Sequence, residues 1–133
     1  MRNDTIPYVK IDTAMIGDYN PGNEYFAITI KGDCLNHDDC PMKIKDGDLL
    51  LCERVERRLF FNNWQSFQNE IILVVPCVPN SLNINHALVK QFVGIEHGWF
   101  FVMRMFNPDA TIELPIDEIK EISIVKKVID HEK

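Results

Sequence analysis

The sequence predicts a mainly β fold, made of twisted antiparallel sheets with few short helices. Short apolar runs rich in aromatic and β-branched residues recur along the chain, and turn-forming residues separate them. Apolar residues at helical spacing are rare by comparison. The 133 residues, 46% hydrophobic and 26% charged, suit one ordinary globular domain, so we expect residues 1–133 to form a single unit.

Each expected strand has its own signal. Residues Tyr25 to Ile30 alternate in polarity, and Asp48 to Cys52 follows a Lys-Asp-Gly-Asp turn typical of hairpins. Glu96-His97-Gly98 is expected to turn one strand into the next. The remaining expected strands are Glu70 to Val75, Ala87 to Val93, Gly98 to Met105, Ile112 to Leu114 and Glu121 to Ile129.

Helical signals are confined to two short places. Phe60, Trp64 and Phe67 recur at a spacing that would line one face of a short helix. Asn62 and Asn63 oppose a longer helix there, since asparagine favours turns. A single turn is expected at Asp117 to Lys120.

The charge balance and the apolar runs exclude two classes of partner. A net charge of -6 argues against a nucleic-acid surface, which needs clustered lysine and arginine. No apolar run approaches the roughly 18–20 residues of a membrane span, and no targeting segment is visible. We therefore expect a cytoplasmic protein without membrane or nucleic-acid binding, without a cofactor, and with cysteines 34, 40, 52 and 77 as free thiols.

Two residues stand out as candidates for acyl-transfer chemistry. Cys34 follows the first strand at a tight corner with Gly32, Asp33 and Leu35, where backbone N–H groups can hold an oxyanion. Lys90 lies in an apolar run, and burial there would favour the neutral amine, which can accept a proton. Cys34 is thus a candidate nucleophile and Lys90 a candidate general base. A thiol loses its proton more readily than an amine, so the pair can also settle as thiolate and ammonium.

The order of motifs resembles the peptidase domain of LexA-type and phage-repressor proteins, the self-cleaving Ser/Lys family related to signal peptidases. Along nearly the whole chain, from Ile6 to Ile129, the matches are Ile30-Lys31-Gly32-Asp33-Cys34-Leu35, the Asp46-Gly47-Asp48 turn with its following strand, Leu88-Val89-Lys90-Gln91-Phe92, the Asn107-Pro108 turn and the last strand ending Ile124 to Ile129. The resemblance implies a LexA/signal-peptidase-like fold. It also implies a catalytic pair at positions 34 and 90, and a domain that dimerises.

The chain departs from that family at several points. Cys34 replaces the nucleophilic serine and Leu35 replaces methionine, while the segments around 36–41 and 59–68 are enlarged. The nearest match to the self-cleaved Ala-Gly bond is Thr13-Ala14-Met15, without the glycine, and no helix-turn-helix is present. We therefore expect a standalone regulatory or assembly module that forms a homodimer or binds another protein. The alternative is an active Cys/Lys peptidase that cleaves itself or a partner.

A third hypothesis is a metal-binding loop. Cys34, His37 and Cys40 are spaced three apart and are zinc-type ligands. A fourth ligand, Cys52 or His86, could come only from elsewhere in the fold. For this reason no metal is expected.

Overall fold

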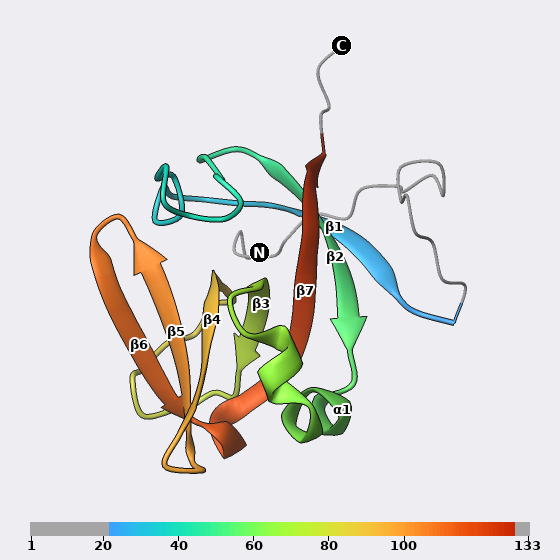
Figure 1. The fold of residues 1–133 in the computed structure, drawn as a ribbon, viewed down its shortest axis with the longest axis vertical. Coiled ribbons are helices and arrows are strands. Elements are labelled where there is room, and N and C mark those ends of the chain that lie inside the picture. Colours follow the sequence, from blue (N-terminus) through green and yellow to red (C-terminus); the bar gives the residue numbers. More distant parts are fainter. Residues whose placement is uncertain (1–21, 130–133) are drawn as a thin grey trace.

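The computed structural model describes residues 22–129, and its strands form one seven-stranded antiparallel sheet in the order β1-β2-β7-β3-β4-β5-β6 (Figure 1). The mainly β prediction is confirmed. The strands are β1 (Tyr25–Thr29), β2 (Leu49–Val55), β3 (Ile71–Pro76), β4 (Leu88–Glu96), β5 (Phe100–Phe106), β6 (Asp109–Pro115) and β7 (Ile119–Ile129). Only α1 (Arg57–Asn62) and the 3-10 turns η2 (Trp64–Phe67) and η3 (Ile116–Glu118) are helical in this part of the chain.

Strand β7 joins the two halves of the sheet. Its eleven residues pair with β2 on one side and with β3 on the other, so that Ile124 lies opposite both Glu53 and Ile72. Figure 1 shows β7 running through the middle, with β3 to β6 on one side and β1 and β2 on the other. The sequence predicted more than one sheet. The structure has a single sheet instead, because β7 pairs with both β2 and β3.

Two predicted turns have the expected backbone geometry. His97 and Gly98 both have positive φ, 55° and 67°, and the Trp99 N–H donates to the Glu96 carbonyl at 3.1 Å, as a tight hairpin between β4 and β5 requires. Gly47 likewise has φ of 90° in the Asp-Gly-Asp turn. That second turn ends the long connection 30–48 between β1 and β2, instead of joining two strands directly.

The aromatic segment after β2 covers one end of the sheet. Asn63 ends α1, and η2 follows as a separate turn, so the predicted single helix is broken there. Phe60 is fully buried, with ring centroids 4.7 Å from Phe67 and 5.0 Å from Phe92. A Cβ at Gly94 would lie 3.2 Å from the Trp64 ring, so the bare glycine lets this ring lie close to β4. Segment 59–68 thus contributes Phe60 to the core, and Phe61, Trp64 and Phe67 pack against it half-buried.

None of the helices within residues 22–129 is long and apolar enough to cross a membrane.

Replacing Phe60 with alanine should lower the free energy of unfolding by about 3–5 kcal/mol, because it leaves a cavity among packed rings. The neighbouring Leu59 is 53% exposed, so Leu59→Ala should change stability by less than about 0.5 kcal/mol. Urea unfolding of both variants provides the comparison. Equal losses would show that α1 does not anchor the aromatic core.

Candidate functional site

The structure brings Cys34 and Lys90 into direct contact. Cys34 lies in the loop after β1 and Lys90 lies in β4, yet the lysine Nζ is 3.2 Å from the cysteine Sγ. The same sulfur lies 3.8 Å from the Val89 carbonyl oxygen. Both residues are half-buried, and within residues 22–129 Lys90 forms no ion pair with a carboxylate. The sulfur is therefore the polar partner of this amine in the described part of the chain.

The corner that carries Cys34 is anchored to the hairpin formed by β5 and β6. The Cys34 carbonyl accepts hydrogen bonds from the backbone N–H of Phe106, at 2.9 Å, and of Asn107, at 3.0 Å. The Asn107 side chain donates to the Asp33 carbonyl at 3.4 Å. The sequence indicated Asn107-Pro108 only as a turn between strands. In the structure this turn also holds the backbone of Cys34 in place.

The acidic residues of the loop act as clamps on the backbone. Asp46 accepts a hydrogen bond from the Gly32 N–H at 2.7 Å, and Asp33 accepts one from the Asp46 N–H at 2.9 Å. Asp48 accepts from the Lys45 N–H at 2.8 Å and closes the turn around Gly47. Gly32 has φ of 96°, a conformation that disfavours any residue with a Cβ. These contacts tie the Gly-Asp-Cys corner to the Asp-Gly-Asp turn.

Three consecutive backbone N–H groups at the thiol remain available. In the described part of the chain, the N–H groups of Asp33, Cys34 and Leu35 donate to no protein acceptor, although Leu35 is only 2% exposed. The Gly32 N–H, also expected to serve an oxyanion, is instead occupied by Asp46. The three available N–H groups are the candidate donors to a negatively charged oxygen beside Cys34.

The three zinc-type residues are engaged in other contacts. Residues 22–129 contain no group of three His, Cys, Asp or Glu side chains arranged to hold a metal ion. The His37 Nδ1 accepts from the Asp39 N–H at 3.0 Å, and its ring stacks on Phe106. The Cys40 thiol donates to the Met42 carbonyl at 3.2 Å. The structure does not assemble Cys34, His37 and Cys40 as a ligand set.

The thiols differ sharply in their surroundings. Cys52 is fully buried, and this burial raises the pKa of its thiol to about 12. Burial also raises the pKa of Cys40, although its hydrogen bond to Met42 partly opposes that shift. Both thiols are therefore protonated at neutral pH.

Two cavities lie along β1. One of about 260 Å³ is lined by Ile28 to Lys31, at and just after the end of β1, and by Leu73, His86, Ala87 and Val89. The other, of about 180 Å³, shares Ile28, Leu73 and Ala87 with it, and we call the two together the β1 groove. Cys34 and Lys90 line neither cavity, but Val89, which lines the first, is the residue whose carbonyl contacts Cys34.

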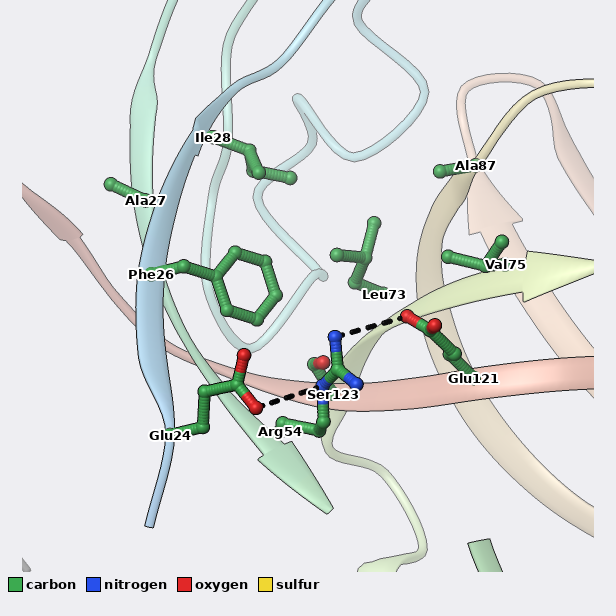
Figure 2. Close-up of a pocket in the computed structure, with 10 residues that line it drawn as sticks. All are labelled: Glu24, Phe26, Ala27, Ile28, Arg54, Leu73, Val75, Ala87, Glu121 and Ser123. Atoms are coloured by element: carbon green, nitrogen blue, oxygen red, sulfur yellow. Dashed lines mark ion pairs between the residues drawn. The ribbon is translucent and has the colours of Figure 1, made fainter. Parts of the chain in front are cut away.

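Figure 2 shows the far part of this groove. Phe26 and Ile28 point from β1 toward Leu73 and Val75 of β3, whereas Ala27 points away. At the end of the groove Arg54 pairs with Glu24, at 3.5 Å, and with Glu121, at 3.3 Å (Figure 2). Sequence reasoning missed the groove. The alternation of Phe26, Ile28 and Ile30 marked one apolar face, but which residues face it across the gap depends on the curvature of the whole sheet.

Comparison with known proteins adds no relative. No family model, curated protein or solved structure matches this chain. The resemblance to LexA-type peptidase domains therefore rests on the residues of this chain alone. The nearest match to the cleaved bond of that family, Thr13-Ala14-Met15, lies outside the described residues.

Removing the Asp46 carboxylate should loosen the corner. Asp46→Ala leaves the Gly32 N–H without its acceptor, and we expect a loss of about 1.5 kcal/mol in unfolding free energy together with an altered alkylation rate at Cys34. Asp39→Ala is the matched control, because the Asp39 carboxylate is 79% exposed and lies no closer than 3.8 Å to His37. Equal stability and equal Cys34 alkylation in the two variants would contradict the clamp.

Proposed function

We propose that this chain is a LexA-like peptidase-type domain in which Cys34 is the nucleophile and Lys90 exchanges its proton. The observation that carries the proposal is the 3.2 Å contact between the cysteine Sγ and the lysine Nζ. That distance is within the reach required for direct proton transfer between a nucleophile and its base. The two residues occupy the positions of the serine and lysine in the family that the sequence resembles.

The chemistry would be acyl transfer. The Cys34 sulfur attacks the carbonyl carbon of a peptide bond, and the N–H groups of Cys34 and Leu35 stabilise the developing oxyanion. Lys90 carries the thiol proton to the leaving amine, so a thioester forms as the C–N bond breaks. Water then hydrolyses the thioester and regenerates the thiol.

The ammonium–thiolate form of the pair is compatible with this scheme. A thiolate needs no base to attack, and the Lys90 ammonium then acts as the acid that protonates the departing amine. An ammonium–thiolate pair has no neutral amine to act as a base. A serine nucleophile would need such a base, whereas a cysteine that is already a thiolate does not.

The groove supports an extended peptide as the substrate. Within residues 22–129, β1 is an edge strand that pairs with β2, so an added strand can pair with its other side along Phe26 to Thr29. The apolar groove beside β1 would receive alternate side chains of such a strand, and its lining residue Val89 contacts the Cys34 sulfur through its carbonyl. Cys34, Cys40, Cys52 and Cys77 are all free, which suits a reducing compartment, and we include a cytoplasmic location in the proposal.

A second candidate function is a regulatory or assembly module that does not cleave. It is favoured by the cysteine in place of serine and by the missing Ala-Gly bond at Thr13-Ala14-Met15. In this reading the Cys34–Lys90 contact stabilises the corner, and the domain forms a homodimer or binds another protein.

An acyl-type active-site probe separates the two candidates. The wild-type protein should be labelled rapidly, with one equivalent at Cys34, and Lys90→Met should slow the labelling by about 100-fold, a typical contribution of general acid–base catalysis. Lys127→Met, which alters an exposed lysine of β7, should label at the wild-type rate. Mass spectrometry of the labelled protein locates the adduct.

Labelling that is slow in the wild-type protein and unchanged in Lys90→Met would favour the non-cleaving module. Intact mass after incubation at mildly alkaline pH tests self-cleavage. We expect two fragments from the wild-type chain and none from Cys34→Ala, and fragments from both would assign the cleavage to another agent.

A further inference from the structure

Cys34 packs against a buried cluster that contains a second thiol, Cys40. Cys40 is 6% exposed and belongs to the buried cluster with Leu35 and Ile44, and Cys34 packs against that same cluster. The peptidase chemistry makes no use of Cys40. A buried thiol beside a nucleophilic one therefore calls for an explanation of its own.

The loop that carries both cysteines is closed by its own backbone hydrogen bonds. The Asn36 N–H donates to the Asp33 carbonyl at 3.0 Å, and the Cys40 N–H donates to the His37 carbonyl at 3.1 Å, so the chain reverses twice over a few residues. The Ile44 N–H then donates to the Leu35 carbonyl at 3.2 Å and closes the loop. The enlarged segment 36–41 is thus wrapped against the corner by its own hydrogen bonds.

The two sulfurs also influence each other electrostatically. Burial is the largest cause that raises the pKa of Cys40, but the charge of Cys34 adds to the rise.

The two thiols differ in exposure and in their polar neighbours. Cys34 is half-buried, and its sulfur lies 3.2 Å from the Lys90 Nζ. Cys40 is buried, and its thiol donates to the Met42 carbonyl. Redox-responsive pairs combine a solvent-accessible cysteine with a resolving cysteine nearby.

We propose that Cys34 and Cys40 form a peroxide-responsive pair, in which Cys34 is oxidised first and Cys40 then closes a reversible disulfide with it. The chemistry of the pair stands on its own. Its consequence, that oxidation switches off the nucleophile, rests on the proposed peptidase function.

The steps balance with hydrogen peroxide as the oxidant. The Cys34 thiolate attacks one peroxide oxygen, the O–O bond breaks, and the departing hydroxide takes a proton from the Lys90 ammonium to leave as water. Cys34 is then a sulfenic acid. The Cys40 sulfur attacks the Cys34 sulfur, the S–O bond breaks, and the hydroxide combines with the Cys40 proton as a second water. Two thiols and one peroxide thus give one disulfide and two waters.

The test treats the full chain with hydrogen peroxide and follows intact mass without reductant. We expect a loss of about 2 Da, a linked peptide that joins residues 34 and 40, and full recovery with dithiothreitol. In Cys40→Ala the reaction should stop at a gain of about 16 Da on Cys34, trapped by dimedone. Cys77→Ala, which alters a half-exposed thiol remote from the loop in sequence, should behave as the wild type.

Three results would overturn the inference: a Cys34 that peroxide does not oxidise, a stable sulfenic acid on Cys34 while Cys40 is present, or a disulfide from Cys34 to Cys77 or to a second chain. The acyl probe gives a separate readout. A reduced protein that the probe does not label counts against the peptidase function, while the mass of the peroxide-treated protein still decides on the cysteine pair.

Discussion

The carbonyl oxygen of Cys34 accepts hydrogen bonds from the backbone amides of Phe106 and Asn107, and the place of the thiol beside Lys90 depends on these bonds. Gln91 pairs with Arg104, so the end of β5 that carries Phe106 lies beside the start of β4, where Val89 and Lys90 are found. An anchor on β5 is therefore also an anchor relative to the lysine. The sheet fixes the register between β4 and β5. The position of Cys34 relative to Lys90 is therefore set by the pairing of these two strands.

The acidic side chains around the Cys34 corner hold the loop backbone in place. The carboxylates of Asp33 and Asp46 accept backbone N–H bonds across the loop, and their acidity makes those bonds stronger than neutral ones. The two carboxylates make these bonds to the backbone, whereas the Cys34 thiol has the Lys90 amine as its polar neighbour. The groove has a similar division, with an apolar floor along β1 and the ionic group of Arg54 at its far end.

The sequence indicated every strand of the sheet, because alternation and turn residues are local signals. The main differences between the predicted and the observed strands lie at the strand ends. For example, β6 begins at Asp109 instead of Ile112, because its pairing with β5 extends to Phe106. The pair Cys34 and Lys90 was predictable from motif order. The Phe106 anchor, the loop folded around Cys40 and the groove opposite Phe26 were not, because each joins segments that only the curved sheet brings together.

The contact between Cys34 and Lys90 spans 56 residues of sequence, and its anchor lies further along at Phe106. The thiol therefore has no lysine beside it until β4 and β5 have paired and docked on the loop. A chain that is still being synthesised, or one that has lost its C-terminal strands, lacks this contact at position 34. The contact is thus tied to completion of the fold, and any reactivity that depends on it would report whether the sheet has been assembled.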